Sequence, residues 1–416
     1  MIETLLQAER LLLHGQVGEA ERLYRGIVAT DPGNAIAMVG LARVALERGD
    51  ERLAYTHACA ALAMDPDNPA AQRLEARLAE IFAARGEVVD RPARVEPSGA
   101  SVEALLAGGH SVTVLDSLVT GHRAAVPAGA RLVEGSIAES AVVERALRED
   151  GIEAVLHCAA RSLVGESVAD PALYYRENVA GGLALLEAMR AAGVERLCFS
   201  STAAIYGEPR STPITEDQPA APINPYGETK RVFEGMLRWY GTAYGLRSIS
   251  LRYFNVAGAS QTVGEDHRPE THLIPNLLAS VAAGEPLTVY GDDYPTPDGT
   301  CIRDYIHVLD LADAHIAALE LTATAPPGLE VLNLGSGSGF SVLDVIRAAE
   351  EVVGRTVAYQ IGPRRPGDPP VLVASNERAA SVLDWQPRRG SLAEMIGSAL
   401  AWRQARLAGA GQPEAR

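Results

Sequence analysis

The strongest constraint on the fold is an alternation of short apolar, strand-like segments with helix-length stretches, which begins near residue 110. The strand-like segments are residues 110–115, 130–133, 154–157, 196–200, 248–253 and 331–333. Strands that alternate with helices predict a mostly parallel sheet with crossover helices on both faces. We therefore expect a doubly wound α/β fold, which binds ligands at the carboxyl ends of its strands.

The beginning of the chain has a different pattern, with residues that recur at a spacing of 34. The recurring pairs are Gly15 and Gly49, Ala20 and Ala54, Asp31 and Asp65, and Asn34 and Asn68. This period, with small residues inside amphipathic helices, resembles the tetratricopeptide repeat. We expect two units, at 1–34 and 35–68, and a capping helix at 69–84. An ordinary helical hairpin is the alternative.

Charge and composition limit the classes of partner. The net charge of −16 provides no basic surface for a phosphate backbone, so neither nucleic acid nor an anionic membrane is an expected partner. The first residues lack the order of a signal peptide, and no apolar run approaches a membrane span, so we expect a cytoplasmic protein. The four cysteines form no CxxC pair, and no metal site is expected.

The strongest candidate for chemistry is the segment from Tyr226 to Lys230. Its two end residues lie one helical turn apart, on one face of a predicted helix. A neighbouring cation lowers the pKa of a phenol by favouring the phenolate. Lys230 is the only lysine among 37 basic residues, which indicates that an ammonium is required at this position. A surface helix pair is the alternative, but Phe199 to Thr202 precede it with a strand end that bears hydroxyl groups.

Longer segments from about residue 104 to 402 resemble the extended short-chain dehydrogenases/reductases, and among them the UDP-glucose 4-epimerase family. The segments that carry the resemblance are SVTVLD (111–116), HCAA (157–160), VGES (164–167), ENV (177–179), FSSTAAIYG (199–207), NPYGETK (224–230), LRYFNVAG (251–258), VYGDDYPTPDGTCIRDYIHV (289–308) and RRPGD (364–368). The resemblance implies a Rossmann-like domain with a smaller C-terminal substrate-binding part.

The family's roles carry over to the matching positions. The resemblance implies that Thr202, Tyr226 and Lys230 are catalytic. It further implies that NAD is bound by Asp116, Ser117, Ile137, Ala159, Asn178, Ser200, Tyr226, Lys230 and Tyr253. The implied substrate-binding residues are Thr202, Asn255, His272, Leu273, Arg303, Tyr305, Arg365 and Asp368.

The implied reaction interconverts UDP-glucose and UDP-galactose by transient oxidation at C4, with Tyr226 taking the hydroxyl proton. Leu372 stands where some relatives have a Tyr that closes the sugar pocket, so N-acetyl forms are also expected substrates. A homodimer is expected by analogy, through helices near 179–192 and 231–244, and the repeats are a candidate contact for a protein partner.

A glycine-rich GxxGxxG loop, which the family uses to bind the pyrophosphate, is missing before the helix expected at 101–107. Ser136 also replaces an Asp that contacts adenine in the family. The alternative is therefore a catalytically impaired sugar-nucleotide-binding or scaffold protein. A 4,6-dehydratase is disfavoured because Ala203 and Ala204, rather than acidic residues, follow Thr202.

The expected organisation has three parts. Residues 1–84 form the helical repeats, 85–98 a linker, and 99–416 the epimerase domain, whose substrate-binding part is mainly 256–300 and 335–400.

Overall fold

The computed structural model describes residues 2–31, 34–65, 68–84, 98–119, 121, 123–265, 270–365 and 368–409. The chain divides into two compact units, Met1–Pro92 and Ala93–Arg416. None of the helices in the described ranges combines the length and apolar character that a membrane crossing requires.

The first unit is a series of helices, each packed against the next in the chain. They are α1 (Ile2–Leu13), α2 (Val17–Thr30), α3 (Ala35–Glu47), α4 (Glu51–Met64) and α5 (Pro69–Ala84). Asn34 and Asp50 cap α3 and α4 by accepting hydrogen bonds from backbone N–H groups in the first turn. Gly40 lets α3 approach Tyr24, because a Cβ there would lie 2.4 Å from the tyrosine ring. The predicted helical repeats are confirmed, and a helix is present at the expected residues 69–84.

The second unit contains the predicted parallel strands. These are β1 (Thr113–Asp116), β2 (Arg131–Glu134), β3 (Val155–His157), β4 (Arg196–Thr202), β5 (Arg247–Tyr253) and β9 (Gly328–Leu334). Strands β3, β4, β5 and β9 form one parallel sheet in that order, and β1 and β2 form a parallel pair. The expected doubly wound arrangement is therefore present.

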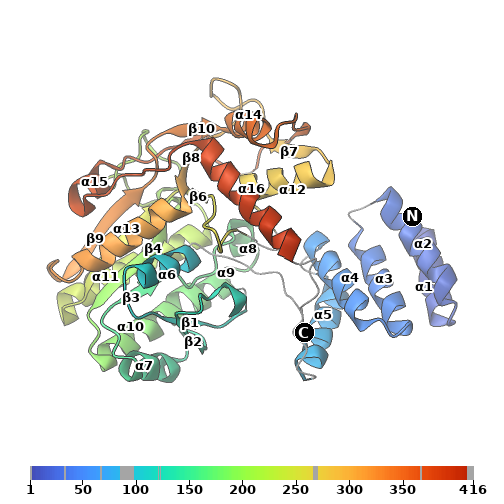
Figure 1. Ribbon diagram of the computed structural model, residues 1–416, viewed down its shortest axis with the longest axis horizontal. Helices are drawn as coiled ribbons and strands as arrows, with labels where there is room; N and C mark the ends of the chain where they lie inside the picture. The colour runs from blue at the N-terminus through green and yellow to red at the C-terminus, as the bar shows by residue number, and fades with distance from the viewer. Residues whose placement is uncertain are drawn as a thin grey trace. The chain divides into compact units, whose positions relative to one another are not determined.

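Helices cover both faces of this sheet (Figure 1). On one face lie α7 (Ser140–Glu149), α10 (Gly181–Ala192) and α11 (Pro225–Tyr244), and on the other α6 (Ser98–Ala107) and α13 (Val308–Leu321). Successive residues of β4 point to opposite faces, so Leu197 and Phe199 join the core beneath α10 and α11. Cys198 joins the core beneath α13. Both faces of β4 are consequently buried.

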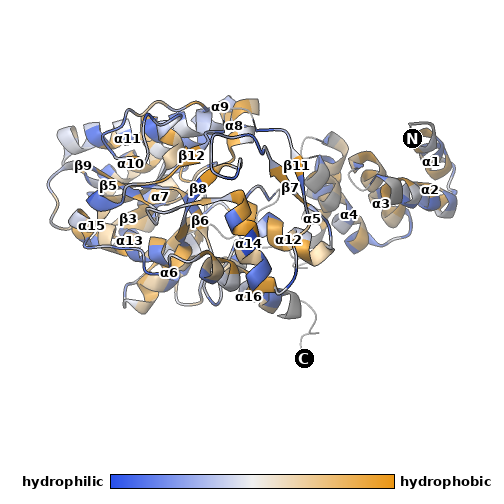
Figure 2. Ribbon diagram, turned by 90° about the horizontal axis from the view of Figure 1, so that it is seen from above, coloured by the Kyte–Doolittle hydropathy of each residue, from blue (hydrophilic) through white to orange (hydrophobic). Residues whose placement is uncertain are grey.

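A smaller part holds the strands that follow β5. It contains β6 (Asn255–Ala257), β7 (Leu287–Tyr290), β8 (Ile302–His307), β10 (Gly339–Ser341), β11 (Tyr359–Gly362) and β12 (Val371–Leu372). Strands β6, β10 and β12 all pair with β8, and β11 pairs with β7. Helices α12 (Leu273–Ala283), α14 (Val342–Val353) and α16 (Leu392–Gly409) enclose its core. Hydrophilic and hydrophobic residues are mixed along α14 and α16 (Figure 2).

Short helical segments connect these elements. They are η1 (Arg123–Ala125), α8 (Val164–Ala169), α9 (Pro171–Tyr174), η2 (Tyr175–Ala180), η3 (Ala203–Tyr206) and α15 (Glu377–Leu383).

Between β1 and β3 in space, the part of the chain that the structure describes provides no strand. In the described ranges β1 pairs with β2 alone, and β3 with β4 alone, so each keeps one strand edge without a strand partner. This is the position of the central first strand in a doubly wound sheet. Residues 85–97, which precede α6, lie outside the described residues, so of the predicted linker the structure describes only Ser98, which begins α6.

Candidate active site

The start of α11 lies against the segment that follows β4. Asn224 caps the helix by accepting a hydrogen bond from the Gly227 N–H at 2.9 Å, and Pro225 occupies its first turn. A Cβ at Gly227 would lie 2.6 Å from the carbonyl oxygen of Ala204, so only glycine permits this approach. The contact brings the turn that carries Tyr226 to η3, which directly follows Thr202.

Lys230 is buried one turn further along α11, with an exposed fraction of 3%. Its Nζ donates a hydrogen bond to the carbonyl oxygen of Ser200 at 2.7 Å. The same Nζ lies 4.8 Å from the ring centroid of Phe199 and 5.9 Å from that of Tyr226. A cation beside a phenol favours the ionised phenolate, which is the form of a tyrosine that can act as a base.

His157 packs beside the same aromatic cluster but adds no charge at neutral pH. Its ring stacks on Phe199 and meets Phe233 edge-on. Burial, and to a lesser extent the positive charge of Lys230, lowers the pKa of His157 to about 3. The imidazole is therefore neutral, and the ammonium of Lys230 provides positive charge beside Tyr226.

Thr202 is the last residue of β4, and its hydroxyl oxygen accepts a hydrogen bond from the Ala204 N–H at 3.1 Å. That bond fixes the side chain at the carboxyl end of the sheet. The ring of Tyr226 also contacts the ring of Tyr174, which it meets edge-on with 6.5 Å between the centroids. The phenol of Tyr174 donates to Glu166, so the neighbouring ring is itself held in place.

A pocket of about 160 Å³ lies at the carboxyl ends of β1 and β3. Four of the predicted cofactor-binding residues line it, namely Asp116, Ser117, Ile137 and Ala159. The residues that sequence reasoning missed there include Arg161 in the loop after β3 and Ser98 and Gly99 at the start of α6. An Asp at this strand end suits the ribose hydroxyls of a dinucleotide. The described residues therefore fit the adenosine end of NAD, while residues 94–97, where the glycine loop is expected, lie outside them.

The structure gives several other predicted cofactor residues a supporting position. Asn178 is buried, accepts a hydrogen bond from the Arg161 N–H at 2.7 Å and donates to its carbonyl oxygen at 3.0 Å. Its side chain thereby holds a loop that lines the pocket. The hydroxyl groups of Ser200 and Tyr253 are hydrogen-bonded to each other across β4 and β5.

The predicted substrate residues gather around β8. Arg303 forms an ion pair with Asp368, and its side chain is 11% exposed. In the parallel register Arg303 lies opposite Leu372 on β12, and Asn255 of β6 lies opposite Tyr305. A nearly buried guanidinium beside a strand end suits the oxygens of a diphosphate.

Other predicted substrate residues differ in their surroundings. The guanidinium of Arg365 stacks on Tyr290, 4.3 Å from the ring centroid. Leu273 begins α12. The side chain of Tyr305 packs in the apolar core of the smaller part, with an exposed fraction of 4%.

His272 lies in a cluster with two carboxylates. Its Nδ1 forms ion pairs with Glu265 and, at 3.3 Å, with Glu270. Burial alone would lower the pKa of His272, but the two carboxylates outweigh it and raise the pKa to about 10. The ligand atoms are close enough to hold a cation, yet a protonated imidazole explains the cluster as an ion pair.

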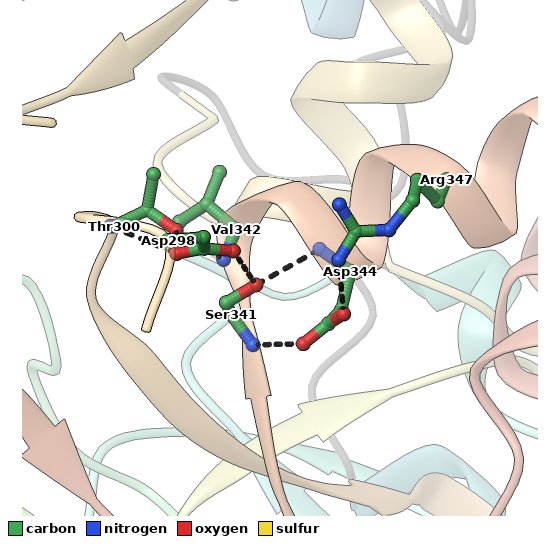
Figure 3. A network of polar contacts seen from close by, with 6 residues as sticks. All are labelled: Asp298, Thr300, Ser341, Val342, Asp344 and Arg347. Carbon is green, nitrogen blue, oxygen red and sulfur yellow. Dashed lines mark hydrogen bonds and ion pairs between the residues drawn. The ribbon is translucent and has the colours of Figure 1, made fainter. Parts of the chain in front are cut away.

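A polar network fixes the segment that leads into β8 (Figure 3). Ser341 caps α14 in a capping box with Asp344 and donates its hydroxyl to Asp298. Thr300 also donates to Asp298, and accepts from the Val342 N–H at 3.1 Å. These contacts join the start of β8 to the start of α14, so this part of the family motif has a structural role beside Arg303.

One buried ion pair near the catalytic residues was not found from the sequence. Glu234 of α11 is 2% exposed and accepts hydrogen bonds from Ser201, Ser250 and Arg252. The spacing of four residues between Lys230 and Glu234 places both on one helix face. That spacing is the signal that could have identified Glu234.

Two protein families match the chain. The NAD dependent epimerase/dehydratase family matches residues 99–335, and the tetratricopeptide repeat family matches residues 11–78.

Proteins named UDP-glucose 4-epimerase are similar to most of this chain. The enzyme of Corynebacterium glutamicum is 51% identical over 303 residues, which are 72% of this chain and 91% of that protein. The structure of the Brucella ovis enzyme in complex with NAD superposes with a TM-score of 0.71 at 44% identity, covering 73% of this chain and 94% of that one. A UDP-Glc/GlcNAc 4-epimerase from Campylobacter jejuni has a TM-score of 0.65 at 36% identity, covering 75% and 97%.

Asp298→Asn is expected to destabilise the second unit at neutral pH. Burial would raise the pKa of Asp298, but the hydrogen bonds from Ser341 and Thr300 outweigh it and hold the pKa below its usual 3.8. A carboxylate with a lowered folded-state pKa contributes stability above its unfolded pKa, and that contribution is lost as the pH falls through the folded value. We expect a loss of about 1–3 kcal/mol at pH 7 that shrinks below pH 4, measured by thermal unfolding.

The exposed Asp217 provides the control, because its side chain is 93% exposed. Asp217→Asn should leave the thermal unfolding curves unchanged at pH 7 and at pH 3. A difference between wild type and Asp298→Asn that stays constant from pH 7 to pH 3 would contradict the role assigned to this network.

Proposed function

The chain belongs to the NAD dependent epimerase/dehydratase family, and from this premise we propose that it interconverts UDP-glucose and UDP-galactose. One observation carries the proposal: Lys230 is fixed beside the ring of Tyr226 at the carboxyl end of β4, where Thr202 ends the strand. The similar enzymes are named UDP-glucose 4-epimerase, and this chain covers more than nine-tenths of the length of each, which supports the same reaction.

The chemistry of the sugar explains why such an enzyme needs a redox cofactor. The hydrogen on C4 of a hexose has no neighbouring carbonyl and is not acidic, so simple deprotonation cannot invert that carbon. When bound, NAD supplies a group that accepts and returns hydride.

The protein side of the reaction is proton transfer at the 4-hydroxyl. Tyr226 removes this proton as a phenolate, which the ammonium of Lys230 favours. Thr202 supplies a hydroxyl that binds the same oxygen and orients it. When the sugar is reduced again, the phenol of Tyr226 returns the proton.

The binding residues divide between two ends of the site. Asp116 and the other pocket residues would hold the adenosine part of NAD. Arg303 and Arg365 would bind the diphosphate of the substrate, since paired guanidinium groups match its oxygens. Because these contacts bind the nucleotide and not the sugar, the sugar remains free to rotate and to present its opposite face to the cofactor.

Tyr226→Phe should reduce conversion of UDP-galactose to UDP-glucose by at least about a hundredfold, because it removes the proton acceptor. The measurement is the conversion rate of purified protein with NAD added. Tyr359→Phe is the matched control, since Tyr359 lies on β11 and is 46% exposed. It should retain the wild-type rate.

Two outcomes would contradict this assignment. Turnover by Tyr226→Phe at the wild-type rate would remove the proposed base. A wild-type protein that binds UDP but converts no UDP-galactose would favour the alternative of an impaired sugar-nucleotide-binding protein.

UDP-N-acetylglucosamine is proposed as a further substrate, because Leu372 is small for its position in the family. Leu372 packs against the core formed by Ala203 and Tyr206, close to the loop after Thr202. The UDP-Glc/GlcNAc activity named for the Campylobacter jejuni enzyme supports this proposal. Leu372→Tyr should lower kcat/KM for the N-acetyl form by about tenfold more than for UDP-glucose. If UDP-N-acetylglucosamine does not compete with UDP-glucose in the wild type, the proposal is wrong.

A homodimer through α10 and α11 is proposed because these helices expose large apolar side chains. Trp239 is 71% exposed, Tyr244 54% and Leu183 45%. Trp239→Glu should convert a dimer into a monomer in light-scattering measurements of mass. Ile361→Glu, at a 47% exposed position on β11, should not. A wild-type protein that is monomeric at micromolar concentration would exclude the dimer.

We also propose a protein partner for the repeat unit, which exposes Leu6 and Ile36 on α1 and α3. The cytoplasmic location expected from the sequence remains a proposal.

A further inference from the structure

We propose that Glu234, paired with Arg252, is a positioning residue that holds α11 against the end of β4 and so aligns Tyr226 and Lys230 with Thr202. The inference rests on the proposed function and assigns a further residue to the same reaction.

Two successive turns of α11 bind two successive residues of β4. Lys230 donates from Nζ to the carbonyl oxygen of Ser200 at 2.7 Å, and Glu234 accepts from the hydroxyl of Ser201 at 2.8 Å. Thr202 is the next residue of that strand, and Tyr226 lies one turn before Lys230 on the helix. Helix and strand are thus joined at two points immediately below the reacting groups.

The carboxylate of Glu234 is also joined to the next strand. Ser250 and Arg252 of β5 donate to its Oε1 at 2.7 and 3.0 Å, and a second nitrogen of Arg252 binds Oε2. In the parallel register Arg252 lies directly opposite Ser201, and Ser250 lies opposite Phe199. The donors therefore share one face of the sheet, the face that α11 covers.

The Glu234–Arg252 pair is buried, and the ring of Tyr206 packs against its guanidinium. The side chains of Arg252 and Glu234 are 7% and 3% exposed. The guanidinium lies 4.9 Å from the ring centroid of Tyr206, whose hydroxyl donates to Asn333 at 2.6 Å. A buried ion pair whose carboxylate accepts four hydrogen bonds permits little displacement, which is the property that a positioning group needs.

A positioning role makes a specific kinetic prediction. The residues around β8, to which the uridine diphosphate is assigned, take no part in the hydrogen bonds described for this pair, so KM for the UDP-sugar should not change. Displacement of Tyr226 and Lys230 by a fraction of an ångström should instead lower kcat. A residue that merely stabilises the fold would change neither constant in the folded protein.

Two matched variants provide the decisive test. Ser201→Ala and Ser250→Ala each remove one hydroxyl donor from the same oxygen of Glu234, but only Ser201 belongs to the strand that ends in Thr202. With saturating NAD, Ser201→Ala should lower kcat for UDP-galactose about tenfold with KM within twofold, while Ser250→Ala lowers kcat less than about threefold. Both should have similar melting temperatures.

Glu234→Gln should lower kcat by about a hundredfold, since it also leaves Arg252 without its counter-charge. Asp310→Asn is the control, because Asp310 is equally buried and accepts from Arg389 but lies on α13, away from the reacting groups. It should keep the wild-type kcat at temperatures below its melting point. If Glu234→Gln does not fold, the two serine variants decide the question.

The outcomes separate this inference from the proposed function. If the wild type converts UDP-galactose while Ser201→Ala keeps the wild-type kcat, or while both serine variants lose equal activity, the positioning role is wrong and the epimerase function stands. If the wild type itself converts no UDP-galactose, the proposed function fails, and the inference fails with it.

Discussion

The hydrogen bond from the Lys230 ammonium to the carbonyl oxygen of Ser200 is the interaction on which the site depends. It buries a positive charge, which is favourable only where polar or aromatic groups replace water. The Ser200 carbonyl and the face of Phe199 provide this environment. The same ammonium lies 5.9 Å from the ring centroid of Tyr226, so the group that fastens helix to sheet is also next to the proposed base. One side chain, the only lysine in a chain with 36 arginines, thus serves the packing and the proposed chemistry.

Among the described residues, the strand that carries Thr202 has more strand and helix neighbours than the strand that carries Asp116. Strand β4, which carries Thr202, is paired on both sides and covered on both faces. Strand β1, which carries Asp116, has one described partner and is only half-buried. The pocket at its end is lined by four of the expected cofactor residues, and α6, which packs against α13, adds Ser98 and Gly99. The proposed catalytic residues and these cofactor residues thus lie on different parts of the sheet.

On the substrate side, the family motif combines residues of two kinds. Arg303 faces the proposed diphosphate, whereas Asp298 and Thr300 join the preceding loop to α14. Tyr305 of the same motif fills the core. The sequence presents these residues as one continuous segment, and nothing in their order distinguishes a residue that binds a ligand from one that supports its neighbour. Similarly, Asn178 holds the backbone of Arg161.

The sequence by itself determined the repeat unit, the parallel strands and the helix that carries Tyr226 and Lys230, because each depends on a short-range period of apolar and small residues. It also showed that the family's GxxGxxG loop is missing from the sequence. Only the tertiary structure revealed the Glu234–Arg252 pair, the burial of Tyr305 and the contact of Gly227 with Ala204. The reason is physical: periodicity records which face of an element is buried, while these contacts join elements that are distant in the chain, and their geometry is set by how helices and strands pack together.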